Sequence, residues 1–176
     1  EYNIPDIDAM VYRYNPEVEA WEFVSRLNLS HGFAYGAAKD NDDKIYIFGG
    51  GDTNNTERYD PSKPEDGFRI IAPMIEDLPN VGVNVGAGTT GSNGNLYALN
   101  TFSGLVPKAV QIFKPENGFW EYHSYFARGV DHQSAAAVKD SKQRIYLIGG
   151  FNGTSPSPYP QGLIPYVLRT KLTVKQ

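Results

Sequence analysis

The sequence predicts an all-β repeat protein, and three observations lead to this prediction. An apolar strand phrase built around a tyrosine occurs three times, at Tyr46, Tyr97 and Tyr146, about every 50 residues. A second phrase alternates with it, in which an aromatic residue two positions before a proline is followed by another bulky aromatic residue. The 18 glycines, 12 prolines and 13% aromatic residues are typical of short strands joined by turns.

Composition and charge exclude several function classes. The net charge of −4, the pI near 5.3 and the lack of a basic stripe argue against a nucleic-acid partner. No apolar run approaches the roughly 18–20 residues that a membrane span needs. The chain has no cysteine, which excludes disulfides, zinc–thiolate sites and thiol nucleophiles but leaves the cellular compartment open.

The elements follow one another in a fixed order. Residues 10–15 alternate and stop at Pro16, and residues 20–24 complete a hairpin. The strand expected at 33–39 is made of small residues, which is typical of a crowded position near a central axis. The continuously apolar segment 45–48 predicts a buried strand. Further strands are expected at 57–59, 68–72, 83–90, 96–99, 109–113, 119–123, 134–139, 145–148 and 166–172. No segment shows capped helical periodicity, so almost no helix is expected.

Glycine pairs end two of the three tyrosine strands. Gly49-Gly50 and Gly149-Gly150 allow a positive φ and a sharp exit from the strand. In the middle copy Asn100-Thr101 replaces the pair, and asparagine tolerates left-handed backbone better than most residues. We therefore expect the same turn in all three copies.

Four short strands per unit of about 50 residues are typical of one blade of a β-propeller. The prediction is one domain, 1–176, forming a propeller segment of about three to three and a half four-stranded blades. Its parts are the outer strands of a first blade (10–24), two blades (33–73 and 83–123) and a partial blade (132–176). An open segment leaves unpaired edges, so we expect the remaining blades of a longer chain, or a homo-oligomer, to complete the ring.

The repeated residues resemble the kelch family. The Gly-Gly pairs, the three strand tyrosines, and the aromatic pairs ending in Trp21 and Trp120, with Phe68 in the tryptophan position of the middle pair, match its unit over roughly residues 10–172. The resemblance implies a kelch-type β-propeller that binds another protein across one face. It identifies the glycine pairs, tyrosines and tryptophans as structural residues.

The strand order places the long connections on one face of the propeller. The loops 25–33, 49–56, 73–83, 100–108, 124–132 and 149–165 are expected on that face, and tight turns such as 41–43 and 92–94 on the other. Function is concentrated on loops held by a rigid scaffold. The residues expected to contact a partner are Arg26, His31, Asn54, Asn55, Phe102, Arg128, His132, Phe151 and Tyr159.

Several groups of residues allow a chemical site but also have a simpler structural interpretation. A metal between His31 and His132 has no supporting zinc or iron spacing, and His123 adds none. Calcium at Asn41-Asp42-Asp43 with Asp52 competes with ordinary turn chemistry. Gly86-Ala87-Gly88 indicates close packing rather than a phosphate loop. No Gly-x-Ser-x-Gly elbow is present.

Three glycosylation sequons occur, at Asn28, Asn54 and Asn152, all in expected loops. They would suit a secreted protein, but the compartment stays open between extracellular and cytoplasmic.

The expected function is a non-catalytic protein–protein interaction or scaffolding module without metal or cofactor. The alternatives are a structural component of a larger assembly and part of a propeller-based carbohydrate-active enzyme. A galactose-oxidase-like copper site needs a Cys–Tyr crosslink, which a chain without cysteine cannot form.

Overall fold

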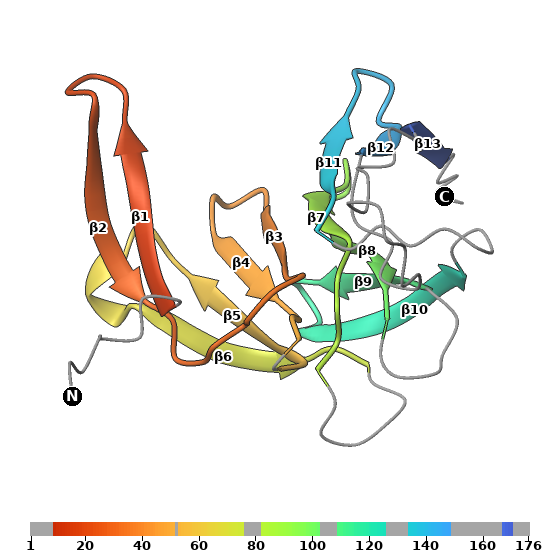
Figure 1. Ribbon diagram of the computed structural model, residues 1–176, viewed down its shortest axis with the longest axis horizontal. Helices are drawn as coiled ribbons and strands as arrows, with labels where there is room; N and C mark the ends of the chain where they lie inside the picture. The colour runs from red at the N-terminus through yellow and green to blue at the C-terminus, as the bar shows by residue number, and fades with distance from the viewer. Residues whose placement is uncertain are drawn as a thin grey trace, which may run out of the picture.

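The computed structural model describes residues 9–51, 53–75, 82–102, 109–125, 134–148 and 167–170. The regular secondary structure of this part is almost entirely antiparallel sheet, and one short 3-10 helix, η2 (Pro64–Asp66), lies in a turn. The prediction of an all-β chain with almost no helix is confirmed (Figure 1). No helix in the described ranges is long and apolar enough to cross a membrane.

The strands form four separate sheets. The first is a hairpin of β1 (Met10–Asn15) and β2 (Ala20–Arg26). The second has the order β3-β4-β5-β6, with bounds Gly36–Lys39, Ile45–Phe48, Asn55–Tyr59 and Phe68–Pro73. The third has the order β7-β8-β9-β10, with bounds Ala87–Thr90, Leu96–Thr101, Ala109–Lys114 and Phe119–Tyr125. The fourth contains β11, β12 and β13, with bounds Ala136–Lys139, Ile145–Ile148 and Val167–Thr170.

The predicted strands are confirmed, but the inner strands begin later than expected. β3 starts at Gly36 and β7 at Ala87, whereas the sequence suggested starts near Phe33 and Val83. Asn84 and Gly86 still bond to Phe102 and Leu99 at the end of β8, but other residues in front of the inner strands bond to different loops. Val85 N–H, for example, donates to Ala34 O at 2.6 Å, and Ala34 has a φ of +56° that a strand does not allow.

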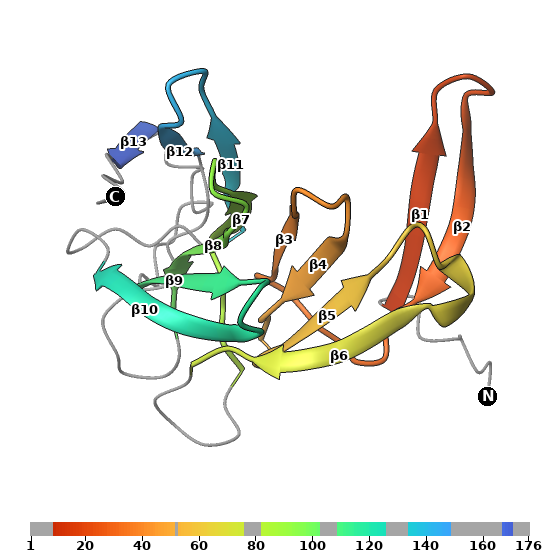
Figure 2. The ribbon, with the colours of Figure 1, turned by 180° about the vertical axis from the view of Figure 1, so that it is seen from behind.

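The sheets follow one another along an arc. The β1–β2 hairpin lies at one end, the two four-stranded sheets lie in the middle and the β11–β12–β13 sheet lies at the other end (Figures 1 and 2). The inner strands β3 and β7 run side by side, and Thr90 Oγ1 donates to Lys39 O between them. A Cβ at Gly88 would lie 2.5 Å from Ala37 O, so the small residues of these strands are required by close backbone packing.

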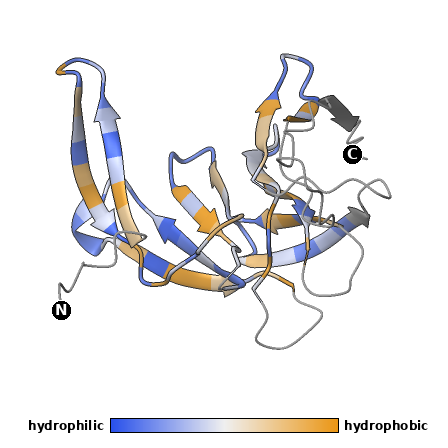
Figure 3. Ribbon diagram, viewed as in Figure 1, coloured by the Kyte–Doolittle hydropathy of each residue, from blue (hydrophilic) through white to orange (hydrophobic). Residues whose placement is uncertain are grey.

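The main core fills the space between the two four-stranded sheets. Tyr46 and Phe48 of β4 face Phe113 of β9 and Trp120 of β10, with ring centroids 5.7 Å apart for Tyr46–Phe113 and 5.0 Å for Phe48–Trp120. Trp120 Nε1–H also donates to Thr56 Oγ1 at 2.8 Å. Hydrophobic stretches of β4 and β6 supply one side of this core (orange in Figure 3). The strands thus pair within each sheet, and in this core aromatic side chains join the second sheet to the third.

The repeated phrase Lys-Asp before the tyrosine strand has a structural reason. Asp40 Oδ1 accepts the N–H groups of Asp42 and Lys44 at 2.9 Å each, and its Oδ2 accepts Tyr46 O–H at 2.8 Å. Asp140 does the same for Lys142, Arg144 and Tyr146. In the middle sheet Gly91 holds this place, and a Cβ there would lie 2.5 Å from the Tyr97 ring.

Candidate interaction face

The long-loop face, as the structure describes it, consists of segments 27–35, 49–51, 53–55 and 82–86. Backbone hydrogen bonds connect these segments to one another. Gly51 N–H donates to Phe33 O at 2.9 Å, Gly50 N–H to Val83 O at 2.7 Å, and Val83 N–H to Thr53 O at 3.2 Å. Three parts of the chain that are far apart in the sequence, namely 27–35, 49–51 with 53–55, and 82–86, therefore form one continuous layer. Hydrogen bonds between them fix its backbone.

A buried carboxylate and a buried histidine form hydrogen bonds with the backbone of this layer. Glu57 of β5 is fully buried, and it accepts the N–H groups of Asn28 at 2.8 Å and Leu29 at 2.9 Å. His31 is 2% exposed, with Nδ1 2.6 Å from Gly49 O and Nε2 3.3 Å from Glu57 Oε1. Because a carbonyl only accepts, Nδ1 carries a proton. The histidine thus links the loop before β3 to the loop after β4.

The hydrogen bonds around Glu57 decide its charge state. Burial by itself would raise the pKa of the Glu57 carboxyl. The hydrogen bonds from His31, Asn28 and Leu29 outweigh burial and hold the pKa below its ordinary value. Glu57 is therefore ionised at neutral pH, and its oxygens act as acceptors for the loop backbone.

Gly49 and Gly50 fit closely into the same layer. Their φ angles are +66° and +121°, which confirms the positive φ expected for the pair. A Cβ at Gly50 would lie 1.8 Å from His31 O. Asn100, at the equivalent place in the middle sheet, has a φ of +55°, so the left-handed turn predicted there is confirmed. Gly149 and Gly150 lie outside the described residues.

Two exposed aromatic side chains stand on this fixed layer. Phe33 is 63% exposed and Tyr35 is 50% exposed, while Ala34 between them is buried. Neither residue is among the predicted partner contacts, because the sequence pattern of segment 33–39 indicates one inner strand. Their position could not be recognised from pattern alone, since it depends on the left-handed Ala34 and on the neighbouring loops.

The structure brings only some of the predicted partner residues to the surface. Arg26 is exposed at the end of β2, and Asn54, Asn55 and Phe102 are half-buried within the loops. The prediction for His31 must be corrected, because its side chain is buried and cannot contact a partner directly. Its Nδ1 bonds to Gly49 O and its Nε2 to Glu57 Oε1. The predicted residues that lie outside the described ranges are Arg128, His132, Phe151 and Tyr159.

The glycosylation sequons differ in their surroundings. Asn28 Nδ2, the atom that would carry a glycan, donates to Glu57 Oε2 at 2.7 Å and to Phe68 O at 2.6 Å. Asn54 is half-buried, and Asn152 lies outside the described residues. Glycosylation therefore stays a prediction from the sequence.

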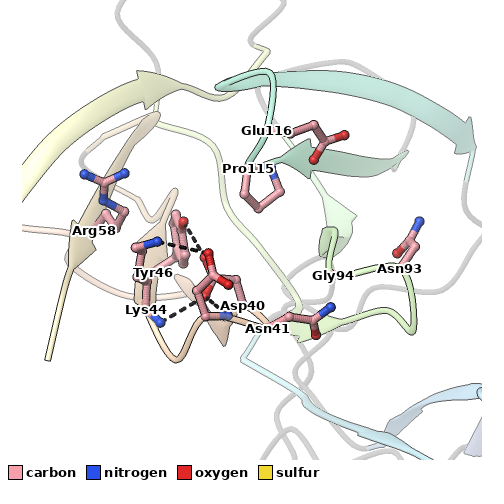
Figure 4. A pocket seen from close by; sticks show the side chains of 10 residues that line it. Asp40, Asn41, Lys44, Tyr46, Arg58, Asn93, Gly94, Pro115 and Glu116 are labelled. Carbon is pink, nitrogen blue, oxygen red and sulfur yellow. Dashed lines mark hydrogen bonds and ion pairs between the residues drawn. The ribbon is translucent and has the colours of Figure 1, made fainter. Parts of the chain in front are cut away.

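A small polar pocket of about 290 Å³ lies on the opposite, short-turn face (Figure 4). Asp40, Lys44, Tyr46 and Arg58 line one side of it, and Asn93 lies on the other. Burial and the Asp40 carboxylate raise the pKa of Tyr46. The hydrogen-bonding capacity of Asp40 is taken up by its own turn and by Tyr46, so this pocket has a structural explanation.

The acidic residues that could have bound calcium take part in turn chemistry, as far as they lie in the described ranges. Asp42 pairs with Lys44, and Asp43 pairs with Lys39. Asp52 lies outside the described residues, and His123 is exposed on β10. No group of three or more histidine, cysteine, aspartate or glutamate residues that could hold a metal ion occurs among the described residues.

No protein-family model and no curated protein matches the chain. Solved structures do resemble it, among them the following two. One is a fungal alcohol oxidase of the AA5 family in complex with copper, at 17% identity and a TM-score of 0.52, with 81% of this chain and 41% of that chain covered. The other is a protein of unknown function from Bacteroides thetaiotaomicron, at 17% identity and a TM-score of 0.56, with 82% and 38% covered.

The chain therefore spans about two fifths of the length of either structure. Identities this low show the fold alone and say nothing of activity. Together with the four antiparallel sheets, they show that the chain has a propeller-type all-β fold.

Proposed function

We propose that the chain is a non-catalytic interaction module, of the kelch type suggested by its repeats, which binds another protein across the long-loop face. The observation that carries this proposal is the exposure of Phe33 and Tyr35 on a backbone that is fixed on both sides of them. Large aromatic residues are enriched at the centres of protein interfaces.

The rigidity of the segment supports this role. Phe33 O accepts Gly51 N–H, and Ala34 O accepts Val85 N–H, so both neighbouring loops hold the aromatic segment. Side chains presented by a fixed backbone lose less conformational entropy on binding than side chains on a free loop. The buried Glu57 and His31 supply this fixation without being available to a ligand.

The kind of partner follows from the chemistry of the face. Two exposed aromatic rings favour a protein surface with an apolar patch or pocket that can take a ring. Arg26, the last residue of β2, is exposed directly before segment 27–35 and would add a charged contact. A scaffolding role, in which the module holds such a protein in place, uses the same surface.

A comparative binding experiment tests the proposal. Wild-type chain and the variants Phe33→Ala and Tyr35→Ala serve as baits side by side, and any protein retained by the wild type is purified and its affinity measured. We expect each variant to lose more than about tenfold in affinity, as for an interface hot spot. The melting temperature should not change, because neither ring belongs to a core cluster.

Asn93→Asp on the short-turn face is the matched control and should bind like the wild type. The proposal fails if the partner binds Phe33→Ala and Tyr35→Ala as tightly as the wild type, or if the short-turn variant loses binding instead.

A further inference from the structure

Four donor groups converge on the buried carboxylate of Glu57. They are the backbone N–H groups of Asn28 and Leu29, the Asn28 side-chain Nδ2–H and His31 Nε2. His31 Nε2 is a donor because the carboxylate opposite it is ionised, and Nδ1 already donates to Gly49 O. Both ring nitrogens therefore carry protons, and a buried imidazolium lies next to a buried carboxylate.

A proton added to Glu57 would disturb this arrangement. The carboxyl group would lose acceptor capacity, and its new O–H would point among donors. The strand neighbours of Glu57 on β4 and β6, Ile47 and Ile70, are apolar and offer no side-chain acceptor. Among the described residues, His31 is the titratable side chain in contact with Glu57, and it is already protonated. Protonation of Glu57 therefore leaves buried N–H groups of segment 27–35 without an acceptor, which destabilises the segment.

The equivalent position in the next sheet cannot titrate. Gln111 is the third residue of β9, as Glu57 is of β5, and it is also buried. It accepts Ile75 N–H at 2.9 Å and donates to Ile75 O at 3.0 Å. A side-chain amide has no proton to gain at ordinary acid pH, so these two bonds persist. Acid therefore acts on the loop that carries the exposed aromatic residues and leaves the corresponding loop of the next sheet in place.

We propose that the long-loop face is acid-sensitive, because a proton added to Glu57 next to the charged His31 frees segment 27–35. Phe33 and Tyr35 then lose the fixed backbone from which they bind a partner. Glu57 and His31 are thus positioning residues, since both are buried and neither contacts the partner. The consequence for binding rests on the proposed function, whereas the release itself is a property of the isolated chain.

The pH at which the release occurs follows from the direction of the Glu57 shift. The hydrogen bonds to Glu57 hold its pKa below the unfolded value of 4.5. The segment is therefore fully fixed above pH 4.5 and is released as the pH falls through the lower folded pKa. A partner bound at neutral pH would dissociate in a strongly acidic medium.

Amide hydrogen exchange of the isolated chain, measured by NMR between pH 7 and pH 3, tests the release directly, because it reports local opening. Protection factors are compared, since they correct for the effect of pH on intrinsic exchange. We expect the protection of the Asn28 and Leu29 amides to fall by more than about tenfold, because each loses a buried acceptor. The Ile75 amide, which donates to Gln111, is the internal control and should keep its protection.

Two outcomes of this measurement would overturn the proposal. One is unchanged protection at Asn28 and Leu29 down to pH 3. The other is an equal loss at Asn28, Leu29 and Ile75, which would show unfolding of the whole chain instead of release of one segment.

Two carboxylate-to-amide variants assign the effect. In Glu57→Gln, protection at Asn28 and Leu29 should be low already at pH 7 and should not change with pH. Glu121→Gln removes an exposed carboxylate that pairs with Lys114, and it should behave like the wild type. An acid response that persists in Glu57→Gln would assign the proton to another group and contradict the proposal. If Glu57→Gln does not fold, the wild-type profile alone decides.

The effect on binding is measured with the protein that the wild-type bait retains. At pH 7, Glu57→Gln should bind it more than about tenfold more weakly than the wild type, although Glu57 is buried. Equal affinities would refute the positioning role. If no protein is retained, or if retention does not depend on Phe33 and Tyr35, the proposed function fails while the exchange result still decides the acid release.

Discussion

Trp120 and Trp21 occupy the same place in two copies of one sequence phrase, yet their surroundings differ. Each faces an aromatic residue across two antiparallel strands, and the ring centroids are 5.4 Å apart in both pairs. Trp120 is buried against Phe48 and Thr56 of the preceding sheet, whereas Trp21 faces solvent. The phrase therefore determines the hairpin and its ring pair, while burial depends on a neighbouring sheet.

The largest expected effect tests this contrast directly. Trp120→Ala removes a buried ring and the hydrogen bond to Thr56, so it should lower the free energy of unfolding by about 3–5 kcal/mol. Trp21→Ala should lower it by less than about 1 kcal/mol at concentrations where the chain is monomeric. Urea denaturation followed by circular dichroism measures both. Equal losses would show that Trp21 is buried in solution within a single chain.

Two glycines with positive φ extend the contrast to the backbone. A Cβ at Gly50 would collide with His31 O, so Gly50→Ala should cost about 2–5 kcal/mol from strain and overpacking together. At Gly118, with a φ of +73°, no atom lies within 4 Å of the added Cβ. Gly118→Ala should therefore cost only about 1 kcal/mol, from the left-handed backbone alone. Denaturant midpoints that shift equally would contradict the close packing of the loop layer.

The smallest expected change in stability concerns Glu57 and Gln111, which occupy equivalent buried positions in the two middle sheets. Each forms hydrogen bonds with the backbone of the loop that precedes its sheet, but with different donors and acceptors. Glu57 accepts backbone N–H groups, whereas Gln111 both accepts Ile75 N–H at 2.9 Å and donates to Ile75 O at 3.0 Å. The pKa of Glu57 is lowered on folding, so its ionised form adds stability above the unfolded value of 4.5. That contribution is lost as the pH falls through the lower folded pKa.

Glu57→Gln should lower the free energy of unfolding by about 1–3 kcal/mol at neutral pH, because an amide N–H₂ would face backbone donors. It should also abolish the decrease in stability that the wild type shows at acid pH. Gln111→Glu should show the opposite slope, since a carboxylate facing the Ile75 carbonyl is favoured only when it is protonated. Unfolding free energies between pH 3 and pH 7 distinguish the two. Parallel pH profiles for the wild type and Glu57→Gln would show that the carboxylate contributes nothing specific.

Much of the fold could be predicted from the sequence because each repeat carries its own local signals. Asp40 and Tyr46 are hydrogen-bonded within one short segment, and Asp140 and Tyr146 form the same bond. The repeated sequence phrase therefore predicts the turn directly. The candidate face was less accessible to prediction. Phe33 looked like part of a strand, and His31 looked like a surface residue, because both assignments depend on loops distant in sequence.

The sequence by itself determined the all-β class, the order of the strands, the turns that join them and the positive φ at Gly49 and Asn100. These features depend on contacts within one hairpin or one turn, which neighbouring residues specify. Tertiary structure alone decided that Trp120 is buried and Trp21 exposed, and that Glu57 and His31 lie beneath the loop layer. Burial is a property of the sheets that surround a residue, and a repeated phrase cannot carry that information for any single copy.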